Sequence, residues 1–108
     1  MEKTLRELCK EVNVTRRAIQ GYEKLGLVIA SGKNLRGYLL YDDFSGERAR
    51  RIKFYQELGF SLKEIKQIID APNDVLKTAL KEQVEKLKSE LGNYHVLIKK
   101  ANELIDSL

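Results

Sequence analysis

The chain has 108 residues, a formal net charge of +4 and a single cysteine, which excludes an intramolecular disulfide framework and a multi-cysteine metal site. It has no apolar run of signal-peptide or membrane-span length, so a cytoplasmic protein without membrane contact is expected. Residues 1–70 carry 14 Lys and Arg against 10 Asp and Glu, and residues 71–108 carry 6 of each, which favours an anionic partner for the first part, although a solvated basic surface would look similar.

Two short helices are predicted at the start of the chain. Thr4 and Glu7 have capping-box spacing, and apolar residues follow at helical spacing up to residue 12. Asn13 suits the left-handed end of this helix, and Thr15 can cap a second helix that ends at Gly26. Two helices joined by a short turn are typical of a DNA-binding helix-turn-helix, but the same hairpin also occurs as a plain structural unit.

A small β-hairpin, or wing, is expected next. The β-prone runs Val28–Ile29 and Leu39–Tyr41 are separated by turn-forming residues, and Lys33 and Arg36 would lie near the tip. Basic residues on a wing can reach phosphates, whereas the alternative is that a polar loop tip is simply solvated.

A second helix pair follows the wing. Its first helix is predicted from a cap at Asp42 or Asp43 to an end at Gly59, with a buried side made of Phe44, Ile52, Tyr55 and Leu58. The remaining surface of this helix is crowded with basic residues: Arg48, Arg50, Arg51 and Lys53. The second helix begins at a capping box of Ser61 and Glu64 and stops before Pro72.

The last part of the chain predicts one long helix with a heptad seam. A helix from Val75 to Leu108 would be on the order of 50 Å long. Its seam residues recur at alternating steps of four and three: Leu80, Val84, Leu87, Leu91, Tyr94, Ile98, Ala101, Ile105 and Leu108. We expect this seam to pair with a second copy, and the alternative is a helical hairpin broken at Gly92. The expected domains are a DNA-binding domain at 1–72 and a dimerisation coiled coil at 73–108.

This order of elements resembles the MerR family of bacterial transcription regulators. The likeness is carried by "VNVTRRAIQGYEKLGL", by "GYLLY" and, most specifically, by "IKFYQELGFSLKEIKQIID", and it covers essentially the whole chain. The resemblance implies a mainly α fold with a winged helix-turn-helix head, a second helix pair and a long antiparallel dimerisation helix. The chain resembles a short form of the family without a separate effector domain.

The resemblance also implies a function. Family members bind a pseudo-palindromic promoter as homodimers and distort the spacer DNA so that RNA polymerase can use both promoter elements. Carried over by position, Arg16 and Arg17 would face the major groove, and Tyr22 would contact the DNA backbone. The full expected DNA-binding set is Thr15, Arg16, Arg17, Gln20, Tyr22, Lys33, Arg36, Gly37, Tyr38 and Tyr41.

Three positions of the predicted recognition helix and wing depart from the family pattern. Gln20 and Gly21 replace an arginine and a tyrosine that usually precede the position of Tyr22, and Leu39 replaces the usual wing arginine. A glycine inside a helix costs about 1 kcal/mol relative to alanine. Gly21 is therefore either an adaptation that lets the backbone approach DNA closely or a sign of weakened DNA binding. The second interpretation makes the chain a dimerising interaction protein that acts through protein partners.

No enzymatic activity, cofactor or metal is expected. The chain has no Gly-rich phosphate loop and no nucleophile and base at usable spacing, and its one histidine, His95, lies on a mostly polar stretch. Cys9 falls on the apolar face of the first helix and is expected to be a core residue. The family likeness allows a small-molecule inducer, which the sequence does not identify, and it does not decide between activation and repression.

Overall fold

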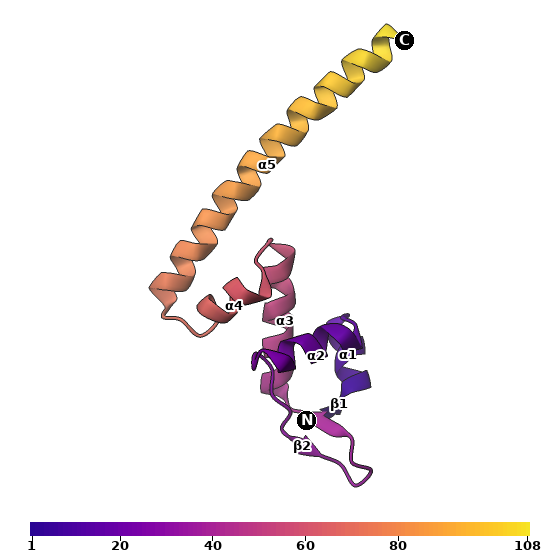
Figure 1. The fold of residues 1–108 in the computed structure, drawn as a ribbon, viewed down its shortest axis with the longest axis vertical. Helices are drawn as coiled ribbons and strands as arrows, with labels where there is room; N and C mark the ends of the chain where they lie inside the picture. The colour runs from indigo at the N-terminus through magenta and orange to yellow at the C-terminus, as the bar shows by residue number, and fades with distance from the viewer. The chain divides into compact units, whose positions relative to one another are not determined.

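The computed structural model describes residues 1–108, which form two compact units, Met1–Asp70 and Ala71–Leu108. The chain is mainly helical, with a small sheet in the first unit and one long helix in the second (Figure 1). The elements in chain order are β1 (Lys3–Thr4), α1 (Leu5–Val12), α2 (Arg16–Lys24), β2 (Gly32–Lys33), β3 (Leu39–Tyr41), α3 (Asp43–Glu57), α4 (Leu62–Ile68) and α5 (Asn73–Ser107).

The predicted helix starts and the left-handed turn after α1 are confirmed. The amide of Glu7 donates to Thr4 Oγ1 at 3.3 Å, while Glu7 Oε1 accepts from the amide of Thr4 at 3.0 Å, which completes the capping box of α1. Asn13 has a φ of 59°, the left-handed conformation that ends α1. A second capping box between Ser61 and Glu64 begins α4 in the same way. Local hydrogen bonding therefore sets these boundaries.

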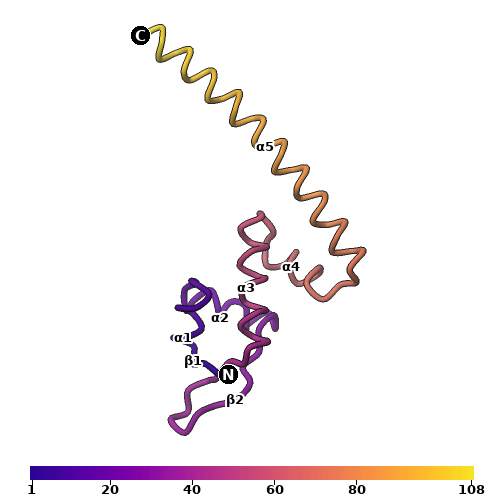
Figure 2. Tube along the Cα trace, turned by 180° about the vertical axis from the view of Figure 1, so that it is seen from behind, coloured from indigo at the N-terminus to yellow at the C-terminus, as the bar shows by residue number.

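The sheet differs from the predicted hairpin. It has three antiparallel strands in the order β1-β3-β2, in which Leu40 of β3 lies opposite both Thr4 and Gly32. The expectation of a strand at Val28–Ile29 is wrong, because Val28 is buried in the core and the pairing begins only at Gly32. The loop between β2 and β3 protrudes from the helices of its unit in both views (Figure 1, Figure 2). The wing is thus present, but shorter than predicted and extended by an N-terminal strand.

The core of the first unit lies among α1, α2, α3, α4 and β3. Its fully buried large side chains are Tyr22, Tyr41, Leu8, Ile19, Ile52, Ile65 and Val28. One prediction for α3 is wrong: Phe44 is 72% exposed. The buried side of α3 begins instead with small residues, Ser45, Gly46 and Ala49, and a Cβ on Gly46 would lie 3.8 Å from Leu8 Cδ1. The helix thus turns Ser45, Gly46 and Ala49 to the core, and Phe44 falls on the side that faces solvent.

The basic residues of α3 bond to the protein itself. Arg48 donates through Nε to the carbonyl of Leu27 at 2.8 Å and through Nη2 to Asp70 Oδ2 at 2.7 Å. Lys53 Nζ donates to the carbonyls of Val12 and Asn13 at 3.2 and 2.9 Å, which satisfies the end of α1. The other two basic residues of α3 also bond within the chain. Arg50 forms ion pairs with Glu11 and Glu47, and Arg51 donates to the hydroxyl of Tyr55 and to the carbonyl of Ile69. The cations of α3 therefore stabilise the first unit.

The second unit is a single uninterrupted helix. Residues 73 to 107 remain helical through Gly92, so the alternative of a hairpin broken at that glycine is wrong. None of the residues of α5 is buried. At 1.5 Å per residue the helix is about 52 Å long. No helix in the structure combines the length and the apolar character needed to cross a membrane.

Candidate nucleic-acid interface

The first turn of α2 presents polar side chains to solvent. Thr15 Oγ1 accepts from the amide of Ala18 at 3.1 Å and so fixes the start of the helix. Arg16, Arg17 and Gln20 are exposed, and neither arginine makes an ion pair within the chain. A Cβ at Gly21 would meet nothing within 4 Å. One face of α2 is thus open, with its donors free for an external partner.

One asparagine, Asn34, fixes the conformation of the wing loop through hydrogen bonds. Asn34 Oδ1 accepts from the amides of Arg36 and Tyr38 at 2.9 and 3.0 Å, and the Asn34 carbonyl accepts from the amide of Gly37 at 3.0 Å. Gly37 has a φ of +83°, where a side chain would be strained. Lys33, Arg36 and Tyr38 are exposed along this loop. The structure thus brings the predicted wing residues together on a short turn of defined shape.

Two residues of the expected DNA-binding set lie in the core. Tyr22 is 1% exposed and its hydroxyl donates to Gln56 Oε1 at 2.7 Å, which joins α2 to α3. Tyr41 is 0% exposed and its hydroxyl donates to Glu23, which joins β3 to α2. Burial raises the pKa of both tyrosine hydroxyls. A tyrosine ring buries a large apolar area once its hydroxyl has a partner, so both residues hold α2 in place against α3 and β3 from inside the unit.

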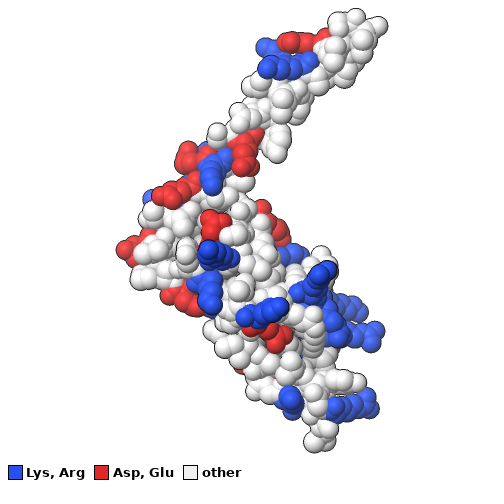
Figure 3. Space-filling view, viewed as in Figure 1, with Lys and Arg blue, Asp and Glu red and all other residues white.

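Unpaired positive charge lies on α1, α2 and the wing, and also at Lys63 and Lys66 of α4. The basic residues of α1, α2 and the wing without an acidic partner are Arg6, Lys10, Arg16, Arg17, Lys24, Lys33 and Arg36. Figure 3 shows Lys and Arg side chains gathered along the side of the first unit that carries the helix-turn-helix and the wing. The expected set lacks three of these residues, Arg6, Lys10 and Lys24. For Arg6 and Lys10 the available signal is their spacing of four residues, which places both on one side of a helix.

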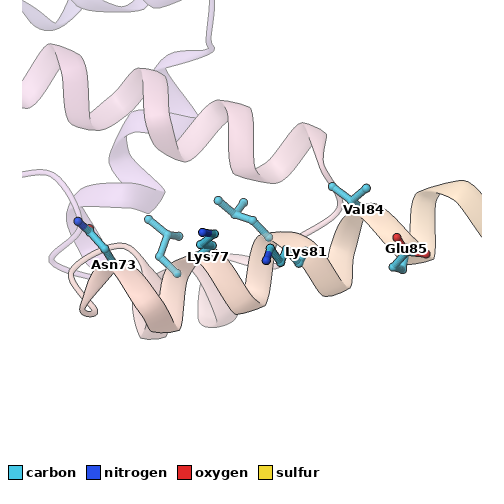
Figure 4. Close-up of a pocket in the computed structure, with 7 residues that line it drawn as sticks. Asn73, Lys77, Lys81, Val84 and Glu85 are labelled. Atoms are coloured by element: carbon cyan, nitrogen blue, oxygen red, sulfur yellow. The ribbon is translucent and has the colours of Figure 1, made fainter.

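The predicted seam of α5 is open to solvent. Val84, Leu91, Tyr94, Ile98, Ile105 and Leu108 are all exposed, and Leu80 and Leu87 are half-buried. Near the start of α5, a groove of about 740 Å³ is lined only by residues of this helix (Figure 4). Its apolar lining is Leu76, Leu80 and Val84, flanked by Lys77, Lys81 and Glu85. The helix therefore has an amphipathic surface whose apolar side is not covered within its own unit.

Cys9 and His95 are the remaining candidate residues. Cys9 is half-buried, and burial raises the pKa of its thiol, which favours the protonated form. His95 lies exposed on α5. No group of three or more His, Cys, Asp and Glu side chains is close enough to hold a metal ion.

Two family models match the chain. The model of the MerR HTH family regulatory protein matches residues 3–72, and a model described as MerR, DNA binding matches residues 47–106. The HTH-type transcriptional activator mta of Bacillus subtilis (strain 168) is 36% identical over 85 residues, which is 79% of this chain and 33% of that protein. The chain thus spans about one third of the length of this curated relative.

Solved structures agree with this assignment. The N-terminal part of the Bacillus subtilis multidrug transporter activator, MtaN, superposes with a TM-score of 0.76 at 30% identity, over 95% of this chain and 97% of that one. HiNmlR, described as a MerR family regulator lacking the sensor domain and bound to promoter DNA, superposes with a TM-score of 0.74 over 92% of this chain and 80% of that one. Its 18% identity supports the fold alone. By its two family models and its relatives, the chain belongs to the MerR family of helix-turn-helix regulatory proteins.

Proposed function

We propose that the chain binds promoter DNA as a homodimer and regulates transcription by distorting the spacer between two half-sites, in partnership with RNA polymerase. The observation that carries this proposal is the division of positive charge in the first unit. The cations of α3 are bonded within the protein, whereas those of α2 and the wing have no acidic partner. Unneutralised cations on protruding elements are what a phosphate backbone attracts.

The proposed reading element is the first half of α2. Arg16 and Arg17 lie in its first turn, where a recognition helix meets the major groove, and arginine can donate to guanine edges or to phosphates. Gln20 lies one turn later on the same helix, and its amide can both donate a hydrogen bond to adenine and accept one from it. Lys33, Arg36 and Tyr38 would contact the backbone from the wing.

The proposed pairing element is the seam of α5. A helix about 52 Å long with a continuous exposed apolar stripe is unfavourable in water as a single strand. Pairing two copies along that stripe would bury it and hold two DNA-binding units at a fixed separation. Fixed separation is the property that lets a dimer hold bent or untwisted DNA, because the deformation energy is balanced by contacts in both halves.

The second candidate is an interaction protein with weakened DNA contacts. Leu39 is 38% exposed on the wing and offers no charge, and Gly21 offers no side chain on α2. If these positions abolish DNA binding, the seam of α5 becomes the main binding element, and the partner is a protein.

A salt-dependent binding experiment separates the two candidates. The full chain would be titrated against the duplex upstream of its coding region and against an unrelated duplex, by fluorescence anisotropy at several salt concentrations. Arg17→Ala and Arg36→Ala would be compared with Lys86→Ala, which removes the same charge from an exposed lysine of α5 outside the seam.

We expect Arg17→Ala to cost about 1 to 3 kcal/mol on the upstream duplex and to reduce its preference over the unrelated one. Arg36→Ala should weaken binding to both duplexes and lower the salt slope by about 0.9. Lys86→Ala should behave as the wild type. Absence of binding to either duplex at low salt, from a chain that sedimentation shows to be dimeric, would refute DNA binding and favour the interaction protein.

A further inference from the structure

A groove of about 550 Å³ lies in the first unit where the start of α1, the start of α2 and the wing meet. Arg6 comes from α1, Arg16 from α2, and Tyr38 and Leu39 from the wing. Three segments far apart in sequence thus contribute to one cavity. It includes Arg6, Leu5 and Leu39, which the expected DNA-binding set does not contain.

The charge of the groove is positive and unopposed. Arg6 and Arg16 are both exposed and form no ion pair, and no residue that lines the groove is acidic. Thr4, which also lines it, has its hydroxyl engaged in the capping box, donating to Glu7 Oε1 at 3.0 Å. The free hydrogen-bonding capacity at the groove therefore comes mainly from two guanidinium groups, which are suited to a phosphate.

The remaining wall of the groove is apolar. Leu5, Tyr38 and Leu39 line it, and Tyr38 is 59% exposed. The wing side is held in shape by Asn34, whose Oδ1 accepts from the amide of Tyr38 at 3.0 Å. An open groove with two guanidinium groups and an aliphatic and aromatic wall matches a ligand that alternates anionic and apolar parts, as a deoxyribose-phosphate strand does.

We propose that this groove binds one deoxyribose-phosphate strand of duplex DNA, with Arg6 and Arg16 on a phosphate and Leu39 and Tyr38 against the adjoining sugar. The inference rests on the proposed function and adds Arg6 and Leu39 as backbone contacts. Arg6 supplies a positive charge next to the wing at a place where Leu39 has none.

The first experiment compares Arg6→Ala with Lys10→Ala. Lys10 is exposed one turn further along α1, has no ion pair and does not line the groove, so it is matched in helix and in charge. We expect Arg6→Ala to lower the salt slope of DNA binding by about 0.9, so that its deficit relative to the wild type shrinks about 3.5-fold between roughly 50 and 200 mM salt. Lys10→Ala should keep the wild-type slope.

The second experiment tests the apolar wall. Leu39→Thr places a strand-favouring, β-branched residue in β3 but removes most of the aliphatic contact. We expect it to lower DNA affinity several-fold at every salt concentration without changing the slope, since no charge is lost. Circular dichroism of all variants checks that the fold is intact.

The third experiment locates the phosphate. Single neutral methylphosphonates would be placed in turn along the upstream duplex, and binding of the wild type and of Arg6→Ala would be compared at each position. One position should weaken the wild type and leave Arg6→Ala unchanged, because that variant has already lost the contact.

The outcomes distinguish the inference from the function on which it rests. If the wild type binds DNA but Arg6→Ala behaves as Lys10→Ala and is additive with every methylphosphonate, the groove does not hold a strand, and the proposed function stands. If Leu39→Thr binds as the wild type, the apolar wall does not contact the sugar. If the wild type binds no duplex, both proposals fail together.

Discussion

Replacing Tyr22 by phenylalanine tests whether that residue acts in the core or on DNA. The ring is 1% exposed and would stay in place, so the change removes only the hydroxyl that donates to Gln56 Oε1 at 2.7 Å. A buried neutral hydrogen bond contributes about 0.5 to 1.5 kcal/mol net. Gln56 is itself exposed, so water can replace the lost donor, and we expect a loss near 1 kcal/mol.

The free energy of unfolding would be measured by urea titration followed by circular dichroism, with thermal melting as a second probe. A loss of about 1 kcal/mol corresponds to a fall of about 4 to 8 °C in the Tm of a unit of this size. A double-mutant cycle with Gln56→Ala should recover a coupling of similar size. DNA affinity of Tyr22→Phe should stay within about twofold of the wild type.

Tyr38→Phe is the matched control, since it removes a hydroxyl from an exposed tyrosine of the wing. We expect it to leave stability unchanged. The reasoning is refuted if Tyr22→Phe lowers DNA affinity about fivefold or more, equivalent to about 1 kcal/mol, while the free energy of unfolding does not change. That result would mean that the hydroxyl is available to DNA.

Three further changes have definite expected results. Gly21→Ala should raise the free energy of unfolding by up to about 1 kcal/mol in a urea titration, because the helix gains an alanine in open space; if the backbone here approaches DNA, affinity should fall at the same time. Asp70→Asn should cost no more than about 1 kcal/mol, because the carboxylate is exposed. The hydrogen bonds from Arg48 lower the pKa of Asp70, so this stabilisation exists above the ordinary carboxyl pKa and is lost as the pH falls; urea titrations from neutral to acid pH should show a smaller decline for Asp70→Asn than for the wild type. Leu91→Asp should reduce the sedimenting mass from dimer to monomer, whereas Ser89→Asp, outside the seam, should not; an unchanged mass for Leu91→Asp would contradict pairing through the seam.

Helix boundaries could be predicted because they depend on a few neighbouring residues. The capping boxes at Thr4 and Ser61, and the left-handed Asn13, each act within four residues of the chain, and the structure shows each of them. The position of the strands could not be predicted in the same way. Val28 and Ile29 have strand-forming side chains, but tertiary packing takes Val28 into the core, and the pairing is left to Gly32 and Lys33.

The exposure of Phe44 and the burial of Tyr22 and Tyr41 could not be predicted for the same reason. Counting apolar bulk selects Phe44 for the buried side of α3, whereas the face that the helix turns to the core carries Ser45, Gly46 and Ala49. Tyr22 and Tyr41 have a polar end and an apolar ring, so sequence position alone does not tell whether the hydroxyl meets a phosphate or a buried acceptor. The exposure of Arg17 and Arg36, by contrast, can be predicted from the sequence, because it depends only on the phase of α2 and on the position of the wing turn.

The internal pairing of the α3 cations has a consequence for the approach of the protein to DNA. A uniformly positive unit would meet a polyanion in every orientation and would have to rotate on its surface. Here Arg48 and Arg50 of α3 pair with carboxylates, whereas seven cations on α1, α2 and the wing have no acidic partner. If the chain binds DNA as proposed, this uneven distribution of unpaired cations would exert a torque during diffusion, and a larger share of encounters would begin with the helix-turn-helix side toward the DNA.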